Sequence, residues 1–171
     1  NAAATLALMQ QAVKRKAVVA VFPELGLSAY SCEDLFHQQA LLKASEAALA
    51  WLLARSKGLP VAAFVGLPVV ADGLLYNCAA LVCRGRLLGV VPKTYLPNYG
   101  EFYEARQFNP ADHAQATQVQ LLGQTVPFGA ALGRVVLDAL GRGVEGRGAG
   151  GVEVQVVAHS SASLIGGVLV R

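Results

Sequence analysis

Two charged residues follow apolar segments in the same way and could act together on a carbonyl group. Glu24 follows the apolar run Ala17–Phe22 and a proline, and Lys93 follows the run Leu87–Val91 and another proline. A partly desolvated carboxylate at a strand end suits a general base, and an ammonium beside it would stabilise an oxyanion. We therefore expect Glu24 and Lys93 to lie about 3–4 Å apart, as an ion pair at the ends of two adjacent strands. Taken singly, each is equally well explained as a surface charge, a lysine through snorkelling of its side chain.

Polar residues elsewhere could complete such a site. Glu101 lies with Glu104 and Arg106 in the loop after Lys93 and could orient the lysine, but an acid–base cluster on a loop is more often structural. Tyr30 and Tyr99 have aromatic bodies and hydroxyls that could line a pocket, although core packing explains an isolated tyrosine as well.

The cysteines and histidines offer no clear nucleophile or metal site. Cys78 and Cys83 are five residues apart on an apolar segment, so a strand would place them on opposite faces as buried small hydrophobic residues. Cys32 precedes a helix, but it is only eight residues from Glu24, which favours a structural role. The three histidines are far apart and lack metal-ligand spacing, so we expect no metal site; they are His37, His113 and His159.

Periodicity predicts an α/β chain that would position these residues. Helices are expected over 2–16 and, in two pieces, over 34–57. Strands are expected over 17–22, 61–70, 74–83 and 87–91, the last two joined by a turn at Arg84-Gly85, with a late strand over 152–157. The segment 126–138 is ambiguous, and the glycine-rich segment 141–151 is expected to be a loop.

The composition favours a large buried core and excludes several classes of protein. The chain has 171 residues, of which 54% are hydrophobic and 15% charged, with a formal net charge of +3. Few charges argue against a disordered chain or a coiled coil, and scattered basic residues argue against nucleic-acid binding. The most apolar stretch, 58–71, is shorter than the roughly 20 residues of a membrane span. Three cysteines without a signal-peptide pattern indicate the cytoplasm.

Two stretches resemble a known family. The string FPELGLSAYSCEDLFHQQALL, residues 22–42, is similar to the segment around the catalytic glutamate of bacterial glutamine-dependent NAD⁺ synthetases. The string GLLYNCAALVCRGRLLGVVPKTYLPNYGEFYEARQF, residues 73–108, is similar to the segment around their catalytic lysine. The KTYLPNY-x-EFYE part distinguishes this family from other members of the nitrilase superfamily. The resemblance covers residues 1–129 and returns weakly at 150–165.

The resemblance implies a nitrilase-like, four-layer αββα sandwich, incomplete at both ends. Residues 1–171 would be one partial carbon-nitrogen hydrolase (glutaminase) domain, with the C-terminal synthetase domain absent. The whole enzyme would hydrolyse glutamine and use the ammonia, with ATP and Mg²⁺, to convert deamido-NAD⁺ to NAD⁺ in the cytoplasm. The resemblance further implies a homo-oligomer and no cofactor, nucleic acid or membrane for this part.

The resemblance also assigns roles by motif position. Glu24 matches the family's general base, Lys93 its catalytic lysine, and Tyr99 and Ser163 two residues that contact glutamine. The family's nucleophile is a cysteine between the VPFG and SAS motifs, and this chain has none there. The sequence CEDL at Cys32 imitates the nucleophile's motif, but its place beside Glu24 matches another family segment, so we do not assign it that role.

Three hypotheses follow from these observations. The first is the glutaminase part of an NAD⁺ synthetase, inactive by itself because it lacks the cysteine. The second is another nitrilase-superfamily amidase that acts on a small amide. The third is a non-catalytic remnant that associates at most through its apolar faces.

Overall fold

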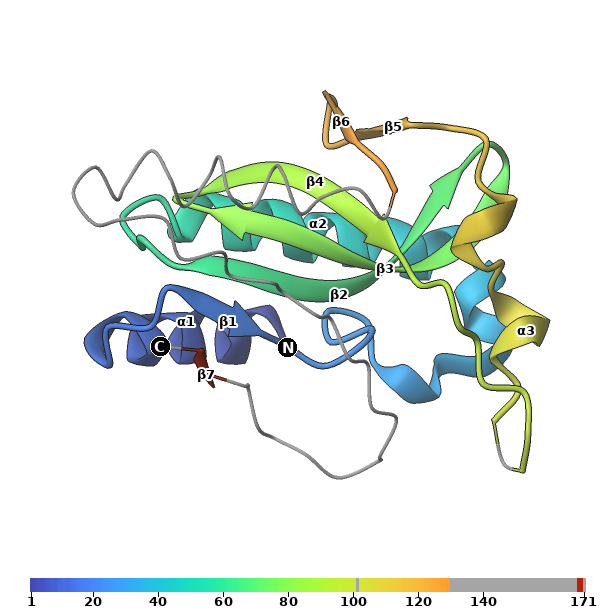
Figure 1. Ribbon diagram of the computed structural model, residues 1–171, viewed down its shortest axis with the longest axis horizontal. Coiled ribbons are helices and arrows are strands. Elements are labelled where there is room, and N and C mark those ends of the chain that lie inside the picture. Colours follow the sequence, from blue (N-terminus) through green and yellow to red (C-terminus); the bar gives the residue numbers. More distant parts are fainter. Residues whose placement is uncertain (101, 130–168, 171) are drawn as a thin grey trace.

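The computed structural model describes residues 1–100, 102–129 and 169–170, and its centre is a twisted five-stranded sheet (Figure 1). The strand order is β4-β3-β2-β1-β7. β1 pairs in parallel with β2, and all other pairs in this sheet are antiparallel. The strands are β1 (Val19–Val21), β2 (Ala62–Ala71), β3 (Leu74–Cys83), β4 (Arg86–Pro92) and β7 (Leu169–Val170).

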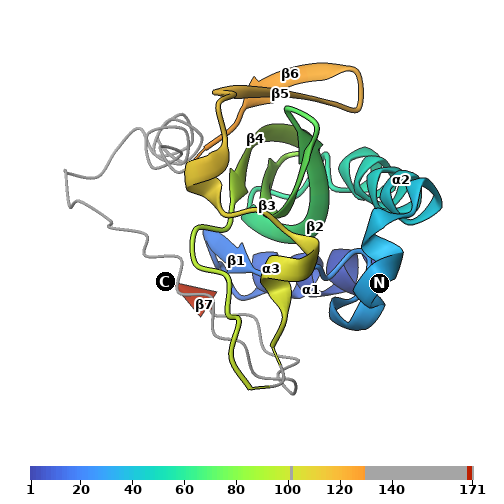
Figure 2. The same ribbon diagram turned by 90° about the vertical axis from the view of Figure 1, so that its right-hand side faces the viewer.

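Two helices cover one face of this sheet (Figure 2). They are α1 (Ala2–Lys14) and α2 (Gln39–Arg55), and the 3₁₀ segment η1 (Tyr30–His37) precedes α2. Met9 of α1 and Leu49 and Leu52 of α2 are fully buried in one cluster with Val65 and Leu67 of β2. The expected helix over 34–57 therefore does form in two pieces, and both helices bury the apolar stripe that predicts them.

The opposite face of the sheet has an apolar cluster of its own. Its buried members are Val19, Ala62, Phe64 and Leu81. Successive strand residues point to opposite faces, so both faces of β2 are apolar, which explains its unbroken hydrophobic sequence. An inner layer of an αββα sandwich needs a sheet of this kind. The α/β fold expected from the sequence is confirmed.

The described part of the chain contains two β-hairpins, β3–β4 and a second one beside it. β3 and β4 are joined by Arg84 and Gly85, which both have positive φ angles of 50° and 73°, as a tight hairpin turn requires. A second hairpin packs along β4, where Val90 bridges to Phe128. It consists of β5 (Gln118–Leu121) and β6 (Gln124–Pro127), and the short helices α3 (Glu104–Gln107) and η2 (Ala111–His113) connect it to β4.

Some expected elements fall outside the described residues. The ambiguous segment 126–138 begins inside β6, and its residues from 130 onward are among those not described. The glycine-rich segment 141–151 and the expected strand over 152–157 are not described either. Of the helices the structure does describe, none has the length and apolarity needed to cross a membrane.

The two strand cysteines lie where the period-two pattern predicts. Cys78 pairs with Leu67, whose side chain faces the helices, and Cys83 pairs with Ala62, whose side chain faces away from them. Both are buried, whereas Cys32 is half-buried. Burial raises the pKa of both strand thiols, and for Cys83 it outweighs the opposing effect of Arg84 and Arg86.

This difference in burial predicts the order in which a thiol reagent labels the chain. Because the thiolate is the reactive form, Ellman's reagent at neutral pH should modify Cys32 first, and Cys78 and Cys83 only after denaturation. Mass spectrometry of peptides from native and urea-treated protein identifies the modified positions. Rapid labelling of Cys78 or Cys83 without denaturant would contradict the described packing of the sheet.

Candidate active site

Glu24 lies in a tight turn that leaves β1. The turn is closed by the Gly26 N–H, which donates to the Pro23 carbonyl oxygen over 3.2 Å. Leu25, the third residue of the turn, has a φ of 53°, a conformation that costs a non-glycine residue about 1–2 kcal/mol. Burial of the Leu25 side chain against Phe36 and Phe108 offsets this cost. The apolar residue after Glu24 therefore anchors the turn that presents the carboxylate.

The turn rests directly on Gly66 of β2. A Cβ atom at Gly66 would lie 2.5 Å from the Pro23 carbonyl oxygen and 2.8 Å from the carbonyl carbon of Glu24. The Leu27 N–H then donates to the Gly66 carbonyl oxygen over 3.0 Å, so the chain rejoins β2 beyond the turn. Only glycine allows this approach, because any side chain would push Glu24 away from the sheet.

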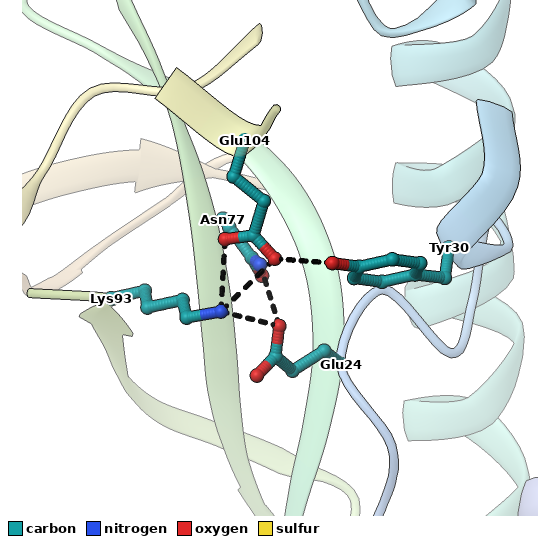
Figure 3. Close-up of polar contacts among 5 residues, drawn as sticks. All are labelled: Glu24, Tyr30, Asn77, Lys93 and Glu104. Carbon is teal, nitrogen blue, oxygen red and sulfur yellow. Dashed lines mark hydrogen bonds and ion pairs between the residues drawn. The ribbon is translucent and has the colours of Figure 1, made fainter. Parts of the chain in front are cut away.

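Lys93 reaches Glu24 from the end of β4. Its Nζ lies 2.8 Å from Glu24 Oε2, which confirms the expected ion pair (Figure 3). The expectation that their strands are adjacent is wrong, because β2 and β3 lie between β1 and β4. The two residues meet because the turn places Glu24 over β2 and the long lysine side chain extends towards it across β3.

A second carboxylate, that of Glu104, completes the cluster. Glu104 is the first residue of α3, and both of its oxygens accept hydrogen bonds from Lys93 Nζ, over 3.1 and 2.9 Å. The side chains are largely buried, with 13% of Lys93, 20% of Glu24 and 6% of Glu104 exposed. One ammonium therefore serves two carboxylates in a partly dry environment. Glu101, which could orient the lysine, lies outside the described residues.

Tyr30 connects η1 to the same cluster. Its hydroxyl donates to Glu104 Oε1 over 2.7 Å. Burial, the hydrogen bond to Glu104 and the negative charges of Glu104 and Glu24 together raise the pKa of Tyr30 well above its usual value. The hydroxyl thus stays a hydrogen-bond donor across the physiological pH range. Tyr30 and Glu104 also line a cavity of about 390 Å³ between η1 and α3, so the sequence interpretation of Tyr30 as a pocket residue agrees with its position.

Asn77 is the residue of the cluster that the sequence interpretation missed. It lies in the middle of β3, and its Nδ2 donates to Glu24 Oε2 over 3.1 Å. Its backbone oxygen accepts a hydrogen bond from the Lys93 N–H over 2.8 Å. The available signal was a single amide in an otherwise apolar strand, LLYNCAALVC.

The remaining sequence candidates lie apart from this cluster or are not described. The Tyr99 side chain is 70% exposed and its ring packs edge-on against Phe102. Arg106 pairs with Asp34 at the surface rather than with the cluster. Cys32 packs beside an apolar group that contains Leu25 and Phe36. Ser163 is among the residues the structure leaves undescribed.

The cluster can hold and move protons but shows no metal-binding pattern. Within residues 1–100 and 102–129, no group of three or more His, Cys, Asp or Glu side chains is placed to hold a metal ion. Two carboxylates bridged by an ammonium, with one carboxylate oxygen left over, instead suit general acid–base chemistry with electrostatic stabilisation of an anion.

Comparisons with known proteins identify a family and several relatives. Residues 1–141 match the profile of the carbon-nitrogen hydrolase family. A glutamine-dependent NAD⁺ synthetase from Mycobacterium tuberculosis is 45% identical over 129 residues, which is 75% of this chain and 19% of the relative. The enzyme of the same name from Mycobacterium leprae is 41% identical over 141 residues, 82% of this chain and 21% of the relative.

A solved structure of a protein with the same name as these relatives is similar to this chain in its fold. The crystal structure of a glutamine-dependent NAD⁺ synthetase from Cytophaga hutchinsonii matches with a TM-score of 0.68 and 28% identity, over 75% of this chain and 22% of that chain. The chain thus spans about a fifth of the length of the curated relatives it matches.

The central position of Lys93 predicts a specific pattern of stability. Replacement of Lys93 by Met leaves two carboxylates facing each other without a counter-charge, and should lower the free energy of unfolding by about 3 kcal/mol. The triple variant Lys93→Met, Glu24→Gln, Glu104→Gln should regain most of this loss, because no uncompensated charge is left. Urea unfolding monitored by circular dichroism measures both effects.

Lys43 provides a matched control, since it is exposed on α2. Lys43→Met should change the stability by less than about 0.5 kcal/mol. If Lys93→Met costs no more than Lys43→Met, the ammonium is not held between the two carboxylates.

Proposed function

The chain belongs to the carbon-nitrogen hydrolase family, and from this premise we propose that Glu24, Lys93 and Glu104 are the base-and-lysine part of an amide-hydrolysing site. The observation that carries the proposal is the contact of Lys93 Nζ with Glu24 at 2.8 Å and with Glu104 at 2.9 Å. A general base beside a fixed ammonium is what hydrolysis of a carboxamide requires, because the amide must be attacked and its oxygen then carries negative charge.

The names of the relatives indicate glutamine as the amide. The enzymes from M. tuberculosis and M. leprae are named for dependence on glutamine and for synthesis of NAD⁺. We propose that this chain supplies the glutaminase part of such an enzyme, in which ammonia from glutamine amidates deamido-NAD⁺. A synthetase domain would bind ATP and Mg²⁺, and no step at the cluster described here involves them. We further propose that the whole enzyme is cytoplasmic and homo-oligomeric.

The first chemical step is attack of a thiolate on the glutamine carboxamide carbon. Glu24 accepts the thiol proton, and the new C–S bond places negative charge on the former carbonyl oxygen. Glu24 then returns the proton to the leaving nitrogen, the C–N bond breaks, and ammonia departs. Water, deprotonated by Glu24, hydrolyses the resulting γ-glutamyl thioester to glutamate and regenerates the thiol.

Lys93 stabilises the oxyanion in this proposal, and its hydrogen bonds support that role. An ammonium has three N–H donors, and here they serve Glu24 Oε2 and both oxygens of Glu104. The contact with Glu104 Oε1 is the longest at 3.1 Å, and the same oxygen also accepts from Tyr30. Lys93 can therefore redirect this donor to an oxyanion while Glu104 stays satisfied. Glu104 acts as the group that holds Lys93 in place.

The nucleophile is the part that this chain does not supply. Its three cysteines are Cys32, Cys78 and Cys83, and none lies between the VPFG and SAS motifs. Among the described residues, Cys32 has no hydrogen bond to Glu24 or Lys93 and packs against apolar side chains. The proposed contacts of Tyr99 and Ser163 with glutamine, and support of the lysine by Glu101, complete the site. The lack of a placed cysteine is also the observation that favours the non-catalytic alternative.

A chimera tests the proposal while supplying the nucleophile. Residues 1–129 of this chain would replace the matching N-terminal segment of the M. tuberculosis synthetase, which provides the remaining parts. Glu24→Gln or Lys93→Ala should lower glutamine-driven NAD⁺ formation by about 10³-fold, within the range for loss of a general base. NAD⁺ formation from added ammonium should be unchanged, because both residues act before ammonia exists.

The control variant is Lys43→Ala, on the exposed side of α2, which should keep both activities. Glutamine-driven synthesis that survives Glu24→Gln would refute the assignment of the base. The 171-residue chain alone should release no measurable ammonia from glutamine, since removal of a nucleophile costs on the order of 10⁶ in turnover. Turnover by this chain that disappears in Cys32→Ser would show that Cys32 is the nucleophile after all.

A further inference from the structure

Asn77 is a buried polar side chain that the proposed reaction does not yet use. It is 2% exposed and lies in β3 between Tyr76 and Cys78, which are both buried. A buried amide is costly unless it is hydrogen-bonded. Its side chain contacts Glu24 and its backbone oxygen contacts the N–H of Lys93, so one strand residue holds both members of the ion pair.

The hydrogen bonds of Glu24 are distributed unequally between its two oxygens. Oε2 accepts from Asn77 Nδ2 over 3.1 Å and from Lys93 Nζ over 2.8 Å (Figure 3). Oε1 is buried and has no hydrogen-bond partner among the described residues. The two oxygens of a carboxylate are chemically equivalent, so a two-fold flip changes nothing, but the terminal torsion of a glutamate is broad and the plane of a free carboxylate would turn through smaller angles. Two donors on one oxygen fix this plane, and with it the place of the oxygen that has no donor.

We infer that Asn77 is a positioning residue that fixes the Glu24 carboxylate so that Oε1 is the oxygen that accepts the proton. The inference rests on the proposed function, in which Glu24 is the base. A base needs an oxygen that no protein donor occupies, and a buried oxygen without a partner is costly until a thiol, an ammonia molecule or water donates to it. Asn77 thus fixes where the free oxygen of Glu24 lies and leaves that oxygen able to accept a proton.

The chemistry of the amide explains why asparagine fits this position. A carboxylate only accepts hydrogen bonds, so the amide nitrogen must face Glu24. An aspartate there would place a second negative charge against Glu24, and a leucine would offer no donor. Among the described residues, the other charged or titratable groups in this cluster are Lys93, which contacts Glu24, Glu104, which contacts Lys93, and Tyr30, which contacts Glu104. All three are retained in the variants below.

The 171-residue chain allows a test that does not depend on activity. Carbon-13 labelling of the glutamate carboxyl carbons lets NMR follow the titration of Glu24, assigned by its loss in Glu24→Gln. A hydrogen bond to the charged form favours that form, so Asn77→Leu should move the titration midpoint of Glu24 upward by about one pH unit. Asn77→Asp, which keeps the shape of the side chain, should also move it upward. The Asn77 side-chain N–H signals should shift in Glu24→Gln.

Asn109→Leu is the control for loss of an asparagine amide that donates a hydrogen bond elsewhere in the structure. Asn109 is half-buried, and its Nδ2 donates to the carbonyl oxygen of Leu75, on the same strand, over 3.2 Å. This variant should leave the Glu24 titration unchanged. A Glu24 midpoint that does not move in Asn77→Leu or Asn77→Asp, or that moves equally in Asn109→Leu, would overturn the inference.

The chimera extends the test to the reaction. Asn77→Leu and Asn77→Asp should lower glutamine-driven kcat by about 10²-fold, because small misplacements of a reacting group have effects of this size. The acid limb of the pH profile should move upward, and ammonium-driven synthesis should be unchanged. If Glu24→Gln loses activity while both Asn77 variants keep full activity, the inference about Asn77 is wrong and the proposed function stands. Full glutamine use in Glu24→Gln would overturn the proposed function and this inference together.

Discussion

The ammonium group of Lys93 contacts two carboxylates at once, and the arrangement of the surrounding elements follows from the need to bring these three charges together. Glu24 comes from the turn after β1, Lys93 from the end of β4, and Glu104 from the start of α3. Two buried carboxylates would repel each other without the cation, and a buried cation would be costly without them. Burial of each charged group is therefore tolerated only when the other two groups are in place, and the fold must position all three.

The three charges can meet because the turn that holds Glu24 approaches the backbone of β2 closely. The turn that holds Glu24 lies against Gly66, where a Cβ atom would meet the Pro23 carbonyl oxygen at 2.5 Å. Leu25 adopts a left-handed conformation in the same turn and is held there by its buried side chain. Strain of this kind persists only where the surrounding structure fixes it, and here it places a carboxylate above a buried strand. The geometry of the cluster thus depends on backbone contacts as much as on side chains.

Local sequence pattern predicts the two long helices, the strands β1 to β4 and one contact, but it predicts neither the hairpin of β5 and β6 nor the order of the strands. The bounds of β3 match because an apolar run ends at the turn Arg84-Gly85, and the Glu24–Lys93 pair was visible from their similar surroundings. Their strands are separated by β2 and β3, which no local pattern records. Asn77 was overlooked because its partner is 53 residues away, and a polar residue in a strand does not reveal what it binds. The sequence places Glu104 in one acid–base cluster with Glu101, and local pattern does not say which carboxylate contacts the lysine; the structure shows that Glu104 does.

Nitrogen-15 NMR of the lysine side chains is the most direct measurement of the central claim, that one ammonium is held between two carboxylates. The chain has five lysines, and exposed ammonium protons exchange rapidly with water. An ammonium held in this way should give a separate, slowly exchanging NH₃⁺ signal for Lys93 at neutral pH, and this signal should shift in both Glu24→Gln and Glu104→Gln. Five lysines with the same rapid exchange, or a Lys93 signal that responds to neither substitution, would show that Lys93 is not held between the two carboxylates.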